Sequence, residues 1–335
     1  MHRSIIGITI ITACLLLLPA LSGDAAPSAG QDPGNGIFGI GLGYLTGNTL
    51  YHISSYDATG GIESELEFPL KTPLFSLSGG YIGRDRKDRE EFRVTLQWLT
   101  NIGSGSGKLK DSDWISGAPE TTPPPAGLGY PAHPGLDIYS ESDITLRANI
   151  IDLRGSYNFW VSNSVSVGPF GGLLYQHFKY DASNAYQTGY GPYAPDFTGF
   201  IPGPVLTYDV TYVIPYVGIH SELIAVRNFK AVAELGVSPF VSASDTDDHL
   251  LRGKVAEGST TGTAFLAALS AQWDLKSNDS ILLQAQYLNI NTSGTQTQTW
   301  YQAEGSIPAG TVVSGINDKI TSQQTSINIL FSHRF

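Results

Sequence analysis

The chain has 335 residues and a formal net charge of −11 at pH 7, with one cysteine, 17 Tyr, 14 Phe, 5 Trp and 38 Gly. The negative charge argues against a nucleic-acid partner, and the shortage of cysteine excludes a fold held together by disulfides. Abundant aromatic residues and glycine favour an acidic β protein.

The first residues have the layout of a secretory signal peptide. A short, positively charged start is followed by an apolar stretch from Ile5 to about Leu18 and by small residues up to Ala25. We therefore expect residues 1–25 to be a signal peptide and residues 26–335 to form the exported chain. The cysteine, Cys14, would leave with the signal. The remaining sequence has no run of 18 apolar residues, so a helical membrane protein is excluded.

Apolar and polar residues alternate with period two along the rest of the chain, which predicts β-strands. Clear examples run from Phe92 to Trp98 and from Phe265 to Trp273. We count ten strands, near residues 36–55, 61–82, 90–102, 138–159, 164–182, 204–223, 229–245, 260–275, 280–293 and 318–335. The longer connections between them are expected at 103–137, 183–203, 246–259 and 294–317.

The last strand ends the chain on an aromatic residue, Phe335, and resembles the C-terminal strand of bacterial outer-membrane barrels. In lipid every backbone donor and acceptor must be paired within the protein, so alternating strands have to close into a barrel. The predicted fold is therefore all-β, a ten-stranded antiparallel transmembrane β-barrel. A soluble β sandwich, which also alternates, is the alternative.

Two acidic strings, Asp111-Ser112-Asp113-Trp114 and Asp245-Thr246-Asp247-Asp248-His249, each follow an alternating segment. Carboxylates and histidine can hold and deprotonate a water at neutral pH, so the strings predict the two halves of a hydrolase site. An even number of strands separates them, which places both at the same end of a barrel roughly 20 Å across. Taken alone, an Asp-x-Asp sequence is more often a solvated turn or a weak calcium contact.

Together these features resemble the omptin family of outer-membrane endopeptidases, ten-stranded barrels with an active-site groove at the extracellular rim. Besides the strings and the strand count, the resemblance rests on Gly43-Tyr44-Leu45-Thr46-Gly47 and Glu65-Leu66-Glu67-Phe68. It implies that Asp111 and Asp113 face a dyad of Asp247 and His249 across the groove. His249 would be the general base, Asp247 would orient its ring, and one of the paired aspartates would hold the attacking water. The resemblance implies no metal, no cofactor and no covalent intermediate.

Two departures from the family concern substrate and lipid. Asp245 matches the aspartate of the family's pocket for a basic residue, whereas Tyr51 occupies the position of the pocket's glutamate, so both are expected to bind substrate and the preference for Arg or Lys stays open. Lys179 matches a residue that binds lipopolysaccharide phosphate, while Thr211 replaces an arginine at another such position.

The sequence thus predicts an endopeptidase in the bacterial outer membrane, with its active site facing the exterior. Its partners would be exposed polypeptides as substrates and outer-membrane lipid, lipopolysaccharide being one candidate. The alternative is a catalytically silent barrel that acts as an adhesin or a structural protein. A narrow pore ranks third, because side chains fill the lumen of a ten-stranded barrel.

Overall fold

The computed structural model describes residues 35–57, 60–115, 136–190, 196–226, 228–275 and 278–335. The predicted signal peptide, residues 1–25, lies outside the described residues. Twelve strands occur in the described part: β1 Gly36–Asp57, β2 Gly60–Arg84, β3 Glu90–Asn101, β4 Gly105–Ile115, β5 Ile138–Tyr157, β6 Phe159–Trp160, β7 Val165–Gly189, β8 Gly199–Val226, β9 Phe229–His249, β10 Lys254–Asp274, β11 Asp279–Trp300 and β12 Val312–Arg334. None of the described residues forms a helix long and apolar enough to span a membrane.

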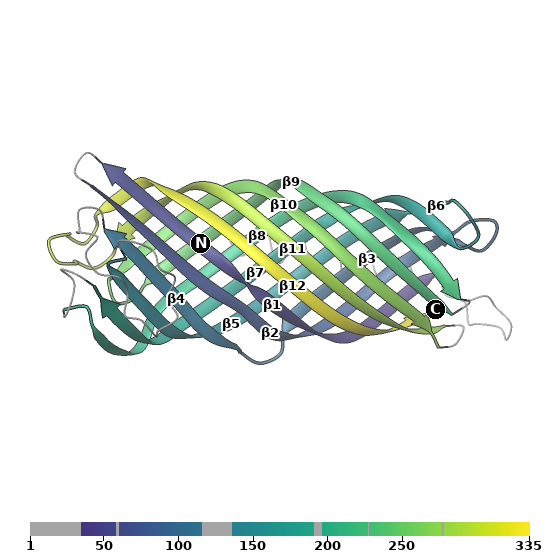
Figure 1. Ribbon diagram of the computed structural model, residues 1–335, viewed down its shortest axis with the longest axis horizontal. Helices are drawn as coiled ribbons and strands as arrows, with labels where there is room; N and C mark the ends of the chain where they lie inside the picture. Colours follow the sequence, from purple (N-terminus) through teal and green to yellow (C-terminus); the bar gives the residue numbers. More distant parts are fainter. Residues whose placement is uncertain (1–34, 58–59, 116–135, 191–195, 227, 276–277) are drawn as a thin grey trace.

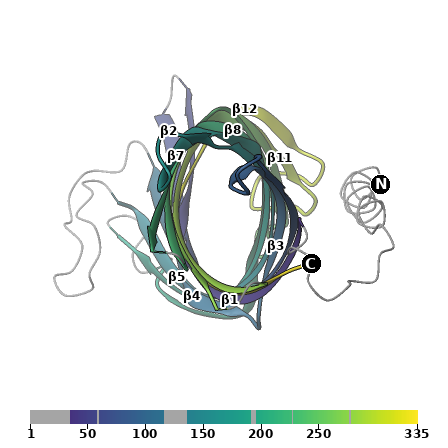
Figure 2. The same ribbon diagram turned by 90° about the vertical axis from the view of Figure 1, so that its right-hand side faces the viewer.

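The strands form one antiparallel sheet that closes on itself. The closing pair is β1 with β12, whose register runs from Ile37 opposite Arg334 to Ser54 opposite Asn317. Closure leaves no unpaired sheet edge, as the predicted barrel requires. Figure 1 shows a long barrel with strongly tilted strands, and Figure 2 shows that its cross-section is oval. The end where β1 begins and β12 ends is called the terminal end below, and the opposite end is called the rim.

The predicted count of ten strands is not exact. β6 is a two-residue strand beside the start of β7, and β3 and β4 both pair with β2 and with β5. From Leu74 to Glu67 β2 advances seven residues, while the opposite chain advances nine, from Asn101 to Lys110. The extra residues form an interruption at Gly103, which has a φ of 73° and so adopts a conformation that glycine tolerates best. The predicted third strand therefore continues beyond this break.

The strands extend farther toward the rim than their sequence pattern predicts. β7 continues to Gly189, β9 to His249 and β11 to Trp300, all within the connections expected at 183–203, 246–259 and 294–317. These extensions are rich in Ser, Thr, Asp and Gly, which locally favour turns. Pairing with neighbouring strands overrides that preference, because strand propensity depends strongly on tertiary context.

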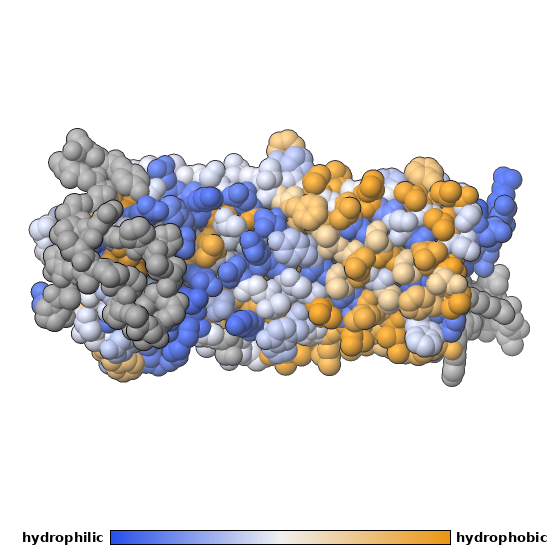
Figure 3. Space-filling model, viewed as in Figure 1, coloured by the Kyte–Doolittle hydropathy of each residue, from blue (hydrophilic) through white to orange (hydrophobic). Residues whose placement is uncertain are grey.

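A belt of exposed apolar side chains surrounds the terminal half of the barrel, which is orange in Figure 3. Its members point outward from alternating positions and include Phe38, Ile40 and Leu42 in β1, Val217, Ile219 and Leu223 in β8, Leu269 and Trp273 in β10, Leu283 in β11, and Ile327, Ile329 and Phe331 in β12. An apolar band of this kind is the surface that an outer-membrane barrel presents to lipid. The half toward the rim is mostly polar outside and thus extends beyond the belt.

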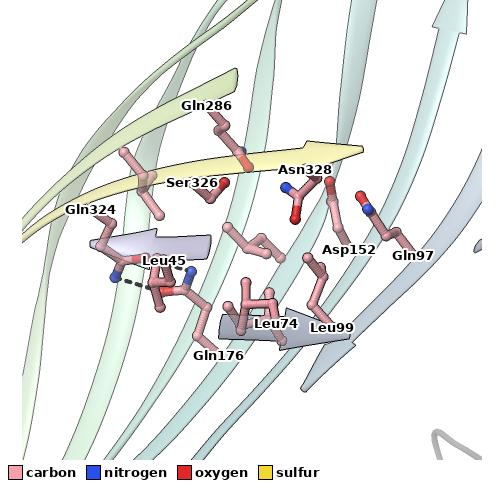
Figure 4. Close-up of a pocket in the computed structure, with 13 residues that line it drawn as sticks. Leu45, Leu74, Gln97, Leu99, Asp152, Gln176, Gln286, Gln324, Ser326 and Asn328 are labelled. Carbon is pink, nitrogen blue, oxygen red and sulfur yellow. Dashed lines mark hydrogen bonds between the residues drawn. The ribbon is translucent and has the colours of Figure 1, made fainter. Parts of the chain in front are cut away.

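Side chains from opposite walls meet inside the barrel at the base of the rim half. Phe68 of β2 stacks on Tyr208 of β8 at 4.3 Å between ring centroids, and Tyr208 also packs against Tyr51 of β1 at 5.0 Å. Farther toward the terminal end, Gln176 of β7 and Gln324 of β12 exchange two hydrogen bonds of 2.8 and 2.9 Å across the lumen (Figure 4). These contacts hold β1, β2 and β12 close to β7 and β8, which fits the oval cross-section.

The terminal half encloses charged side chains around a cavity of about 150 Å³. Lys230 of β9 bridges Glu90 and Glu222 at 3.1 and 3.3 Å, and Arg93 of β3 also pairs with Glu90. Buried charges need such partners to offset their desolvation. The lumen is therefore occupied by ion pairs beneath the belt and by aromatic rings nearer the rim.

Placing a charge on the belt should destabilise the barrel in lipid. Leu283 is exposed and lies opposite Ile329, which in turn lies opposite Leu42, so it is near the middle of the belt. We expect Leu283→Arg to lower the free energy of unfolding in lipid vesicles by about 2–4 kcal/mol, because a cation at that depth is poorly solvated. Thr295→Arg, on the outer face of the same strand toward the rim, is the control and should cost far less. Equal losses in denaturant titrations would contradict this placement of the lipid.

Candidate active site

The second acidic string lies on the inner face of β9 at the rim. Asp245, Asp247 and His249 occupy alternating positions, so the period-two geometry of a strand directs all three side chains into the barrel. The sequence pattern predicted Asp247 and His249 in a loop after the strand, whereas β9 includes both. Their backbone is held by pairing with β8 and β10, which fixes the side chains more firmly than a loop would.

Asp247 and His249 are in direct contact. Oδ2 of Asp247 lies 2.8 Å from Nε2 of His249, and the Asp247 side chain is 1% exposed whereas that of His249 is 17% exposed. Neither carboxylate oxygen of Asp247 has a hydrogen-bond partner among the described residues, so the two side chains are in close contact without a well-directed hydrogen bond. With Nε2 turned toward the carboxylate, Nδ1 is the ring nitrogen available to another group.

The first acidic string lies in β4, across the lumen from β9. β4 runs between β2 and β5, with Asp113 opposite Ser64 and Asp111 opposite Ser140. Both aspartates are partly exposed, and the Ser64 hydroxyl lies 3.5 Å from Oδ1 of Asp111, a long contact. Because β4 is paired on both sides, the two carboxylates occupy fixed positions on the barrel wall.

Electrostatic coupling brings the two halves of the site together. Burial raises the pKa of Asp111 well above its usual value, and the charges of Asp113 and Asp247 raise it further. Burial also raises the pKa of Asp113, which His249 partly offsets. Asp247 of β9 thus acts on Asp111 of β4, and His249 of β9 acts on Asp113. Electrostatic interactions thus connect all four predicted catalytic residues at the rim.

Two cations, which sequence reasoning missed, also interact with this site. Lys254 of β10 lies opposite His249, is 3% exposed, and is 3.3 Å from Oε1 of Gln298. Burial lowers its pKa to about 8, with a further contribution from the nearby Arg252. Both cations lower the pKa values of Asp111 and Asp113.

No group of three or more His, Cys, Asp or Glu side chains within the described ranges could hold a metal ion.

Asp245 and Tyr51, the predicted substrate-binding residues, lie deeper on the inner wall. Tyr51 is fully buried, and its hydroxyl donates to Oε1 of Gln296 at 3.1 Å. Asp245 is joined there by Asp318 of β12, which sequence reasoning also missed. A signal was present, because Asp318 stands between Ile316 and Ile320 at the inward positions of an alternating strand.

Lys179, the predicted lipid-binding residue, lies on the outer wall in β7. It stands opposite Asp209 of β8 and Arg147 of β5, toward the rim from the apolar belt. Thr211 is nearby on the same outer face, where its hydroxyl contacts Nδ1 of His177 at 3.0 Å. Lys179 is therefore separate from the inner-wall site.

Solved structures resemble this barrel. A crystal structure of the outer membrane protease OmpT from Escherichia coli matches with a TM-score of 0.71 at 16% identity, covering 90% of this chain and 97% of that one. The transport unit of the autotransporter AIDA-I from the same species reaches 0.36 at 13% identity, with 97% of both chains covered. OprG from Pseudomonas aeruginosa reaches 0.32 at 12% identity, covering 91% of this chain and 98% of that one. Only the first of these matches supports a conclusion, and at its level of identity that conclusion is the fold.

No curated protein sequence matches this chain. A family model does match, over residues 34–332, and its description is the Omptin family. The matched range includes both acidic strings and all ten predicted strands apart from the last three residues. The chain therefore belongs to the omptin family.

Proposed function

We propose that this protein is an endopeptidase of the bacterial outer membrane, with its active site at the rim facing the exterior. Membership of the omptin family, the apolar belt and the barrel fold support the membrane location. The observation that carries the catalytic proposal is the contact of 2.8 Å between Asp247 and His249, on a strand whose charges act on Asp111 and Asp113.

In the proposed mechanism, a water lies between His249 and the pair of Asp111 and Asp113. His249 takes a proton from this water while the water oxygen bonds to the scissile carbonyl carbon. Asp247 orients the imidazole and stabilises the imidazolium that forms. The proton then passes to the leaving nitrogen as the carbon–nitrogen bond breaks. No metal ion and no covalent enzyme intermediate take part.

The acid pair supports this role because its members are inequivalent. Burial raises the pKa values of both groups, but the charges of Asp113 and Asp247 raise that of Asp111 further, whereas the neighbouring Ser64 lowers that of Asp113. Adjacent carboxylates with different surroundings favour a state in which one holds a proton and the other is ionised. The ionised member accepts a hydrogen bond from the water, and the protonated member can donate one to the carbonyl oxygen.

The proposed substrates are exposed polypeptides. Carboxylates outnumber cations among the residues of the candidate site. The site should therefore attract cationic segments of a substrate polypeptide. The proposed lipid partner would be bound through Lys179, a cation on the outer wall toward the rim from the belt, and lipopolysaccharide would supply a phosphate for it.

Removing either member of the dyad should abolish proteolysis. We expect Asp247→Asn and His249→Ala to lower kcat/KM on a mixed peptide library by about a thousandfold or more, because the general base or its orientation is lost. Asp248→Asn is the control and should retain activity. Asp248 is the adjacent residue, and its carboxylate accepts a hydrogen bond from the hydroxyl of Tyr301. A chelator should leave the wild-type rate unchanged. If the wild type and both variants bind host surfaces equally and cleave no peptide, the protein is an adhesin.

Removing the charge of Lys254 should shift the pH profile. This cation lowers the pKa values of Asp111 and Asp113, so Lys254→Gln should raise both. The mechanism needs an ionised member of the pair, and the rate falls as pH drops through its pKa. The acid limb of kcat/KM should therefore move to higher pH in this variant. Lys319→Gln, on the outer wall of β12, should leave the profile unchanged, and an unmoved limb in Lys254→Gln would contradict the assignment.

A further inference from the structure

Asp245 and Asp318 form a buried pair of carboxyl groups at the inner wall. Asp245 lies opposite Gly258 of β10 on the neighbouring strand β9, and Asp318 of β12 extends over β11 to lie against the same glycine. A Cβ atom on Gly258 would collide with Oδ1 of Asp245 and with Oδ2 of Asp318. Gly258 has an ordinary strand conformation, so its lack of a side chain is needed here for space. The wall is thus shaped to bring the two acids together.

The pair has no positive partner among the described residues. Asp245 is 3% exposed and Asp318 is 2% exposed, and neither forms a salt bridge there. None of their four carboxyl oxygens has a hydrogen-bond partner among the described residues, and each carboxyl group shifts the pKa of the other, as neighbouring acids that share one proton do. Two buried groups beside them, the hydroxyl of Tyr208 and Nε2 of Gln296, have no hydrogen-bond partner. Polar groups buried in this way indicate that a partner is missing.

The electrostatics agree with a shared proton. Burial, followed by the neighbouring Asp318, raises the pKa of Asp245 to about 9. Burial raises the pKa of Asp318 to about 6. At pH 7 the pair therefore holds one proton and one negative charge. The titratable groups that face it are Asp247 of β9, Tyr51 of β1, and Tyr208 and Tyr212 of β8. From β10 and β11 it is faced by Gly258 and Gln296, which carry no charge.

Building on the proposed function, we propose that Asp318 is a specificity-determining residue that forms, with Asp245, a proton-exchanging site for a cationic substrate side chain. The incoming ammonium or guanidinium group takes the position between the carboxyl groups, and the shared proton leaves to solvent. The pair then carries two negative charges beside the new positive charge. Tyr208 and Gln296 border the same space, and Gln296 already accepts a hydrogen bond from Tyr51.

Asp318 also explains how Tyr51 can stand where the family's pocket has a glutamate. Tyr51 supplies no negative charge, since burial and the nearby carboxylates raise the pKa of its hydroxyl. Asp318 lies opposite Ile53, two residues along β1 from Tyr51, and so supplies a carboxylate to the same space from the adjoining strand. In this chain β12, and not β1, therefore supplies the second carboxylate of the pocket. Comparing the residues at position 51 alone does not reveal this.

The test measures charge selectivity with two peptides that differ at one residue. The full-length protein, refolded in outer-membrane lipid, is given a peptide with lysine at the cleavage site and a twin with norleucine, which has a similar chain without the charge. We expect Asp318→Asn and Asp245→Asn each to lower the ratio of kcat/KM for lysine over norleucine by about tenfold or more, because one carboxylate of the pair is lost. The loss should fall on the lysine peptide, because norleucine carries no charge for the missing carboxylate to meet.

Asp209→Asn is the matched control, because Asp209 lies at a similar height on the outer wall, opposite Thr246. It should leave the ratio unchanged. The norleucine rate reports that each variant is folded. If Asp318→Asn retains the wild-type ratio, Asp318 does not determine specificity and the inference is wrong, although the proteolytic function stands. If the wild type cleaves neither peptide, the proposed function itself has failed.

The proton exchange has its own readout in the pH dependence of the ratio. Binding of the cation releases the shared proton, which titrates at about 9, so the wild-type preference for lysine should decline steadily as pH falls from about 9. It should decline more steeply below about 6, where the free pair takes up a second proton. Using a ratio removes effects of pH on the catalytic groups that both peptides share. The ratio in Asp318→Asn should vary far less with pH. A wild-type ratio that is constant from pH 5 to pH 8 would overturn the exchange.

Discussion

The structure depends on one constraint, that a sheet surrounded by lipid must pair all of its backbone hydrogen-bonding groups. Closure satisfies the constraint, since β12 returns to β1 over the length of both strands. It also assigns every residue to one of two faces. Odd-numbered positions of β9 from Val241 to His249 point inward, while the outer face of the terminal half is covered by the apolar belt. Reactive groups can therefore collect inside without weakening the contact with lipid.

A large part of this arrangement follows from the sequence. Period-two alternation predicts most strands, and parity predicts that Asp111, Asp113, Asp247 and His249 gather at one end. The ends of strands are harder to predict, because residues such as those from Asp245 to His249 favour turns until neighbouring strands pair with them. The continuation of β3 into β4 past Gly103 was missed for the same reason.

Contacts between strands that are not neighbours leave no mark in the sequence pattern, even where alternation shows that a residue such as Asp318 points inward. The pairing of Asp245 with Asp318 joins residues far apart in sequence, on strands separated by two others, and depends on the space above Gly258. Lys254 likewise looks like an ordinary surface lysine next to a glycine, but its register opposite His249 places it inside. Such residues become visible only when the register of each strand pair is known. The electrostatics of the site are set by these partners as much as by the two acidic strings.

The ring layer of Phe68, Tyr208 and Tyr51 gives the rim a solid floor, and ion pairs occupy the lumen beyond it. Under the proposed function, a polypeptide that enters from the rim meets these side chains in the lumen, which oppose its passage through the protein. It must lie across the opening and leave by the way it came, with both ends outside. For the proposed endopeptidase, such an entrance suits the cleavage of long chains at internal bonds, and it would let hydrolysis proceed without opening a path through the membrane.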